Sequence, residues 1–155
     1  MPLDMFLDLG PIKGESQDKV HAGKIDILAW SWAVSNSGPP RSGGGGGSAK
    51  ATFQDIAITK FIDLSSTELL KAVSLGTHLP EAKIIVRRAG GNARHEYYSI
   101  TMKDVMVTSC QTSGSEGGDQ LTESVTLAFA SFEVTYHAQN AKGRPAGEST
   151  FGHTI

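Results

Sequence analysis

Alternation of apolar and polar residues, the pattern of β-strands, dominates this chain. Its clearest early stretch is 24–34, Lys-Ile-Asp-Ile-Leu-Ala-Trp-Ser-Trp-Ala-Val. Successive side chains of a strand point to opposite faces. One face therefore carries the heavier set Asp26, Leu28, Trp30, Trp32 and Val34. The other carries the lighter set Ile25, Ile27, Ala29, Ser31 and Ala33. We expect the heavy face, with Trp30 and Trp32 as core anchors, to hold a β core.

The light face leaves more than one interpretation open. Ala29, Ser31 and Ala33 are small enough to lie against a second sheet, against a partner, or beside a water-filled space. From the residues alone, sheet-on-sheet packing is the simplest of these.

Further strands follow the same period. Alternation with β-branched and aromatic residues predicts strands over 5–9, 53–61, 82–88, 96–107 and 121–136. We expect a bulge near Asp55 and a bend near residues 130–131. From Gln139 onward, Gly143, Pro145 and Gly147 predict a loose tail.

One helix is predicted, beginning at Ser65. Ser65 and Glu68 have the spacing of a capping box. Gly76 stands where a left-handed residue ends a helix of about three turns. The apolar stripe that should bury this helix, and so the remaining core anchors, is Leu69, Leu70 and Val73.

Two stretches cannot build a core. Residues 41–50, Arg-Ser-Gly-Gly-Gly-Gly-Gly-Ser-Ala-Lys, predict a long exposed loop, and residues 113–119 predict a second flexible loop. Loops of such length are commonly functional or disordered.

Composition bounds the class of protein. The 155 residues fit a single domain, 1–155, that is long enough to bury a core without the help of disulfides or metal ions. A formal net charge of -2 argues against a nucleic-acid partner. Cys110 is the only cysteine, which excludes an intrachain disulfide and a thiolate metal cluster. The N-terminus lacks the features of a secretory signal, and no apolar run is long enough for a membrane helix.

No catalytic motif is evident, and we expect neither enzyme activity nor a cofactor. Lys50 follows the glycine run but precedes a predicted strand, whereas a phosphate loop needs Gly-Lys-Ser/Thr opening a helix. Gly14-Glu15-Ser16 lacks the closing glycine of a nucleophile elbow. The histidines, His21, His78, His95, His137 and His153, have no metal-ligand spacing.

Several segments together carry a resemblance to a known family. They are Asp4-Met5-Phe6-Leu7, Ile12-Lys13-Gly14-Glu15-Ser16, His21, Ile25 to Trp32, Thr59-Lys60-Phe61-Ile62-Asp63, Arg88-Ala89-Gly90-Gly91 and Leu121 to Leu127. In order and spacing, from residue 4 to about residue 136, the chain resembles the haemolysin-coregulated protein (Hcp) family, the tube proteins of bacterial type VI secretion systems.

This resemblance implies a mainly β fold: a two-sheet β-barrel with one flanking α-helix and a long protruding loop. It also implies a homohexameric ring. Stacked rings would form a tube inside a contractile sheath, capped by a spike protein, with effector proteins in the bore. Such a tube is cytoplasmic when assembled and is secreted on firing without a cleaved signal peptide or stable membrane insertion.

The resemblance also gives the loops and the light face expected roles. Ala29, Ser31 and Ala33 would face the bore and contact effectors. Ring stacking would use Gly43, Gly44, Gly45, Gly46, Gly47, Ser48, Gly90, Gly91 and Asn92, with the C-terminal tail. For the glycine loop, a disordered tip is the alternative. The rival functions are a monomeric β-barrel that binds a small ligand and an enzyme of unrecognised type.

Overall fold

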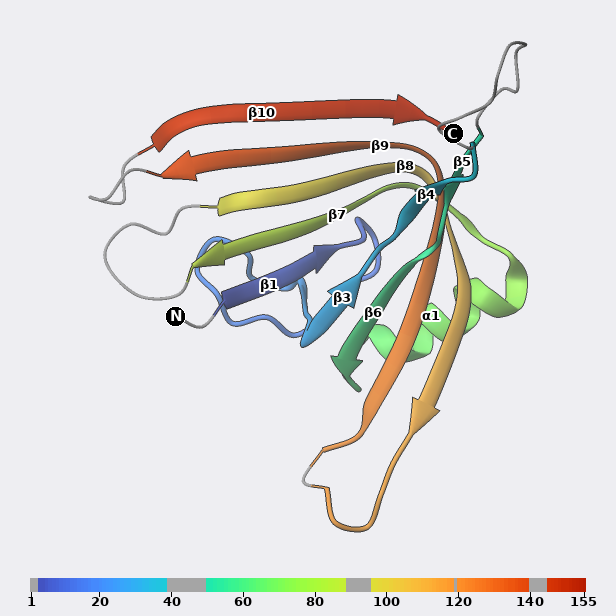
Figure 1. Cartoon of the computed structure of the whole chain (residues 1–155). Coiled ribbons are helices and arrows are strands. Elements are labelled where there is room, and N and C mark those ends of the chain that lie inside the picture. The colour runs from blue at the N-terminus through green and yellow to red at the C-terminus, as the bar shows by residue number, and fades with distance from the viewer. Residues whose placement is uncertain (1–2, 39–49, 89–95, 119, 140–144) are drawn as a thin grey trace.

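The computed structural model describes residues 3–38, 50–88, 96–118, 120–139 and 145–155. It is mainly β, with one helix among the described residues and two sheets, as predicted (Figure 1). The elements are β1 (Leu3–Asp8), β2 (Ile25–Asp26), β3 (Ala29–Ser31), β4 (Val34–Asn36), β5 (Ala51–Phe53), β6 (Ile56–Phe61), α1 (Ser65–Leu75), β7 (His78–Arg88), β8 (Glu96–Ser113), β9 (Thr122–Gln139) and β10 (Pro145–Thr154).

The large sheet curls around the core. Its strand order is β2-β1-β7-β8-β9-β6-β3, with β10 beside β9, and β4 and β5 form a separate two-stranded sheet. The two ends of this order are bridged by one chain segment. Ile27 N donates to Met5 O of β1 at 3.1 Å, and Leu28 N donates to Thr59 O of β6 at 2.8 Å. One segment therefore links the two ends of the strand order, although the large sheet itself is not closed.

This crossing corrects the predicted face assignment of 24–34. Ile25 and Ile27, expected on the light face, are 0% and 6% exposed, whereas Leu28 is 44% exposed. Beyond the crossing, Trp30 and Trp32 pack against the core as expected. The buried positions change from odd to even numbers because the segment exchanges β1 for β6 as its partner. The predicted single strand is thus three short ones.

The helix also differs from its prediction at both its cap and its stripe. The first helical residue is Ser65, and the amide and hydroxyl of Ser65 both donate to Asp63 Oδ1, at 2.9 and 2.5 Å. Asp63 therefore replaces the expected Ser65–Glu68 capping box. Leu69 is fully buried and Val73 is half-buried, but Leu70 is 57% exposed. The prediction of Leu70 as a core anchor is therefore wrong for this chain, because Leu70 lies on the outer side of α1.

A bend divides the β8–β9 ribbon, as Figure 1 shows. In β9 the buried positions change from Val125 and Leu127 to Phe132, so the expected interruption near residues 130–131 is present. Opposite it in β8, Asp104 has a φ of 53°. A left-handed residue in a strand inverts the alternation. In both strands, the side chains that point inward therefore change between odd-numbered and even-numbered positions at the bend.

The C-terminal tail is not loose. β10 pairs with β9 from Pro145 to Thr154, and every residue from 146 to 155 is exposed. The expected tail is therefore an ordered edge strand, because β9 supplies the partner that the sequence of β10 alone does not reveal. The predicted stacking residues Gly43, Gly44, Gly45, Gly46, Gly47, Ser48, Gly90, Gly91 and Asn92 lie outside the described residues.

Candidate functional site

Two rows of small uncharged side chains cross four neighbouring strands on their outer face. The first row is Ser31, Ala57, Thr126 and Ser109, and the second is Ala29, Thr59, Ser124 and Gln111. Residues directly opposite in antiparallel strands share a face. We call these eight residues the hydroxyl face. Five are exposed and Ala57, Thr59 and Thr126 are half-buried.

Hydroxyl groups on and beside the hydroxyl face form hydrogen bonds with one another. Thr126 Oγ1 lies 2.6 Å from Ser109 Oγ and 2.7 Å from Thr108 Oγ1. Thr108 also donates to Asp55 Oδ2 at 2.7 Å, which places a carboxylate only at the border. Ala33 is exposed just beyond β3. The result is a wide surface that offers neutral hydrogen-bonding groups and no charge.

Both edges of this four-stranded sheet are unpaired in the described chain. β3 is hydrogen-bonded only to β6. At the other side, β7 accompanies β8 only as far as Met106, so residues 107–113 of β8 pair only with β9. Free strand edges present backbone donors and acceptors to another chain.

Charged residues are held behind the hydroxyl face instead of on it. Lys60 and Glu123 are 0% and 3% exposed, and the Lys60 ammonium contacts Glu123 Oε1 and, at 3.0 Å, Asp63 Oδ1. Ser66 donates to Glu123 Oε1 at 2.7 Å. Buried charges are tolerated only when they are paired and hydrogen-bonded. This network ties the start of α1 to the inner side of β6 and β9.

Cys110 lies at the edge of this network. Its Sγ is 3.7 Å from Glu123 Oε2, and burial, followed by the Glu123 charge, raises the pKa of the Cys110 thiol. The thiol is therefore kept protonated, because the opposing effect of the Lys60 charge is smaller, and Cys110 is not activated as a nucleophile.

A loop over 10–24 covers the outer face of β1 and β7. Gly14 is required there because a Cβ would lie 2.7 Å from Ile25 Cα. Arg87 of β7, 4% exposed, donates to Asp18 Oδ2 at 2.9 Å and to Asp4 Oδ2 at 3.1 Å. The hydrogen bond from Arg87 holds the pKa of Asp18 well below its usual range. This charge cluster fixes the loop to the sheet.

His21 fixes the same loop from its other side. Lys24 Nζ lies 2.8 Å from His21 Nδ1, and His21 Nε2 lies 2.6 Å from Glu96 Oε1. An ammonium group can only donate, so Nδ1 accepts and the Nε2 proton is donated to Glu96. His21 thus joins β8 to the loop through both of its ring nitrogens, which gives it a structural role.

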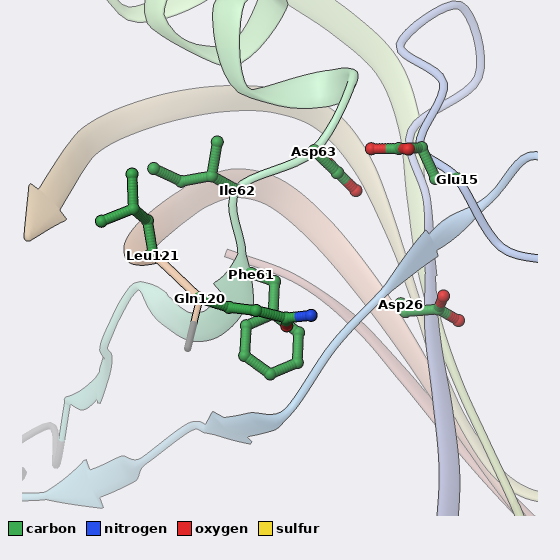
Figure 2. Close-up of a pocket in the computed structure, with 7 residues that line it drawn as sticks. All are labelled: Glu15, Asp26, Phe61, Ile62, Asp63, Gln120 and Leu121. Carbon is green, nitrogen blue, oxygen red and sulfur yellow. The ribbon is translucent and has the colours of Figure 1, made fainter. Parts of the chain in front are cut away.

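A pocket of about 430 Å³ opens at the end of the barrel where β6 stops (Figure 2). Its lining residues are Glu15, Asp26, Phe61, Ile62, Asp63, Gln120 and Leu121. Glu15 Oε2 accepts a hydrogen bond from Leu64 N at 3.0 Å, which links the 10–24 loop to the start of α1. Burial raises the pKa of Asp26, and the charges of Asp63, Asp18 and Asp4 add to this effect. We call this site the acidic pocket.

The structure extends the predicted site and leaves part of it undescribed. Ala29, Ser31 and Ala33 are all exposed. Sequence reasoning missed the other six residues of the hydroxyl face, which lie on β6, β8 and β9 beside Ala29 and Ser31. The alternation Thr122-Glu123-Ser124-Val125-Thr126 carries a signal for them. The pairing register, however, is needed to bring them beside Ser31.

Within the described part of the chain, no group of three or more His, Cys, Asp or Glu side chains is arranged to hold a metal ion. None of the helices described is both long and apolar enough to span a membrane.

The fold and sequence define the class of protein. The sequence profile of the family described as "Type VI secretion system effector, Hcp" matches residues 6–136. The chain belongs to this Hcp family of type VI secretion system proteins.

Individual relatives agree with this assignment. Protein hcp1 of Pseudomonas aeruginosa is 51% identical over 156 residues, covering 100% of this chain and 96% of the relative. A solved type six secretion system protein superposes with a TM-score of 0.92 at 26% identity, covering 99% of this chain and 96% of the other. Hcp1 from Salmonella typhimurium gives a TM-score of 0.81 at 29% identity, with 99% and 95% coverage. These likenesses extend along nearly the full length of this chain.

Proposed function

We propose that the chain is the structural tube subunit of a type VI secretion system. Six copies close into a ring, rings stack into a tube, and the hydroxyl face lines the bore. In this role the protein has no catalytic centre, and its partners are further copies, a contractile sheath, a spike protein and the effectors it carries. The tube is assembled in the cytoplasm and released on firing.

One observation carries this proposal. The four-stranded sheet has an outer face without charged side chains, and each of its two edges has unpaired backbone groups. β3 of one copy and residues 107–113 of β8 in the next are complementary, because each offers a free backbone edge. A heterologous contact of this kind closes into a ring when its rotation allows. Pairing around the ring would cover these two edges, which would otherwise be open to aggregation.

The chemistry of the hydroxyl face supports its placement in a bore. Small hydroxyl and amide side chains keep a confined surface wet, and they offer weak hydrogen bonds to a passenger. Repetition around a ring multiplies such contacts, so avidity does not require a strong single contact. Ala29, Ser31 and Ala33 are then the part of the bore supplied by β3 and the residues just after it.

Light scattering of the purified chain tests the proposal. The expected particle mass is near six times the 16.4 kDa of one chain. The monomeric ligand-binding barrel would instead give the mass of a single chain. A monomer at every concentration in the micromolar range would contradict the ring.

A further inference from the structure

A single exposed charge borders the hydroxyl face. The strands of this face and the turns beside them contain three charged residues, Asp55, Lys60 and Glu123, across the ranges 29–35, 53–61, 107–113 and 122–128. Lys60 and Glu123 are buried behind the face, whereas Asp55 is exposed. Asp55 is therefore the one charged side chain that these described ranges present to the outside.

The position of Asp55, directly before β6, is fixed by its neighbours. Gln54 N donates to Ala33 O at 3.1 Å, and Trp32 Nε1 donates to Gln54 O at 2.8 Å. Thr108 donates to Asp55 Oδ2 at 2.7 Å. Within the described part of the chain, no cationic side chain pairs with Asp55. The carboxylate is thus held in place, and its other oxygen can still accept a cation.

The hydroxyl groups beside Asp55 are oriented by its carboxylate. A carboxylate only accepts hydrogen bonds, and a hydroxyl has one proton to donate. Thr108 gives its proton to Asp55, so Thr126 Oγ1, 2.7 Å from Thr108 Oγ1, must donate to Thr108. Ser109 Oγ, 2.6 Å from Thr126 Oγ1, must in turn donate to Thr126. The three protons all point toward Asp55, so these hydroxyls offer acceptors to a molecule that lies on the face.

Charge and hydrogen bonding therefore favour the same kind of partner. A lysine or arginine side chain carries the opposite charge to Asp55 and has only donors, which suit a row of acceptors. A glutamate or aspartate side chain would meet a like charge and lone pairs. In a closed ring the carboxylate recurs once per copy. Repetition of one sign of charge around a confined space raises the local concentration of the opposite charge.

We propose that Asp55 selects passengers, retaining proteins that present a lysine or arginine to the hydroxyl face and rejecting those that present acids there. This inference rests on the proposed tube and gives its bore a charge preference. Asp55 supplies the ion pair, and the hydroxyls of Thr108, Thr126 and Ser109 accept further hydrogen bonds from donors beside it. Because the rest of the face is neutral, the preference depends on Asp55.

Binding of charged peptides to the purified ring tests this preference. The probes are short glycine–serine peptides that carry a neutral dye and several arginines, or glutamines or glutamates at the same places. In fluorescence anisotropy at low salt, the arginine peptide should bind about 10-fold or more tighter than the glutamine peptide, and the glutamate peptide should bind weakest. Salt at about 0.5 M should reduce the difference between the first two to within about 2-fold, because it screens the charges.

Variants of Asp55 separate its charge from its shape. Asp55→Asn keeps a side-chain oxygen for Thr108 but removes the charge, so the arginine peptide should bind within about 2-fold of the glutamine peptide. Asp55→Lys should reverse the preference, so that the glutamate peptide binds best. Asp26→Asn in the acidic pocket and Glu133→Gln beyond the bend each remove an exposed acid elsewhere. Both controls should leave the preference unchanged.

A blocked face locates the binding. In a Cys110→Ser background, a bulky maleimide label on Ser31→Cys should abolish binding of the arginine peptide. The same label on Glu133→Cys should leave that binding intact. Binding that survives the label on Ser31→Cys would place the cation elsewhere on the ring and overturn the inference.

The remaining outcomes separate this inference from the tube itself. Rings that do not prefer the arginine peptide, or whose preference survives Asp55→Asn, overturn the role of Asp55 and leave the tube standing. A chain that light scattering shows to be monomeric throughout overturns the proposed function.

Discussion

The β8–β9 ribbon presents two different outer faces, one on each side of the bend at Asp104. Beyond the bend, toward β10, Lys103, Glu133 and His137 stand on the outside, and the inner side carries apolar residues such as Ile100 and Met102. This is the ordinary arrangement of a surface strand. Before the bend the order is reversed, because the outer face holds hydroxyls and the charges of Lys60 and Glu123 lie inside.

The neutral outer face before the bend is not what a solvent-exposed surface requires. Lysine and glutamate are ordinarily exposed to solvent, and burying them has a large desolvation cost. A sheet that buries such a pair and keeps its outer face neutral has an outer face constrained by something other than solubility. A bore shared by six copies would impose that constraint, since a charge there would be repeated around the hole.

The sharpest test of this contrast removes one buried charge. Lys60→Met keeps the volume of the side chain but leaves Glu123 without its cation, and should cost about 3–5 kcal/mol of unfolding free energy. Lys103→Met removes an exposed lysine 3.6 Å from Glu81 and should cost less than about 1 kcal/mol. Denaturant titrations of both variants give the comparison. Equal costs would remove the distinction between the two halves of the ribbon.

A second test concerns the helix behind the hydroxyl face. Leu69→Ala should cost about 2–5 kcal/mol because Leu69 is fully buried. Leu70→Ala, one residue on, should cost less than about 1 kcal/mol in a folded monomer because its side chain is exposed. Thermal unfolding of the two alanine variants under dissociating conditions measures this. A larger effect at Leu70 would mean that α1 buries the opposite stripe.

The 10–24 loop covers the outer face of β1 and β7, and acid should weaken the attachment of this loop to the sheet. The pKa of Asp18 is lowered when the chain folds, chiefly by its hydrogen bond with Arg87. The contribution of Asp18 to the free energy of unfolding is therefore complete above its unfolded pKa, about 3.9. This contribution is lost as the pH falls toward the pKa of the folded state. Asp18→Asn should be less stable than the native chain at pH 7, with a gap that narrows below pH ~4. A gap independent of pH would contradict the ion pair.

The smallest expected change in stability comes from the hydroxyl face itself. Ser31→Gln enlarges an exposed side chain and should change the unfolding free energy by about 0.5 kcal/mol or less. Rings should survive, while retention of a cognate effector falls. Glu133→Gln, beyond the bend, should affect neither property. Co-purification of effector with each ring variant measures retention, and unfolding by Ser31→Gln would place Ser31 in the core.

Local pattern predicted most elements but not the points where the chain changes partners. Trp30 and Trp32 share the inward face, as their spacing indicates. Ile25 and Ile27 do not follow the same alternation. The segment changes its partner strand from β1 to β6, and the local sequence carries no signal for this change. Leu70 was expected in an apolar stripe, but only the position of the sheet decides which leucine of α1 is buried.

The candidate site shows the same limit. The small residues Ala29 and Ser31 could be found on one strand by alternation alone. Their continuation onto β6, β9 and β8 depends on the register of three strand pairs, which residues far apart in sequence determine together. Buried Lys60 and Glu123 are equally hard to foresee, since each is ordinarily an exposed residue.

If the protein forms the proposed ring, the hydroxyl face should line its bore. Ser31→Cys, in a Cys110→Ser background and labelled with a small gold cluster, places a dense marker on this face for negative-stain imaging. Glu133→Cys, labelled in the same way, marks the face beyond the bend. We expect sixfold rings with gold inside the central hole for Ser31→Cys and outside it for Glu133→Cys. Ser31 gold on the outer rim, or particles without a hole, would contradict it.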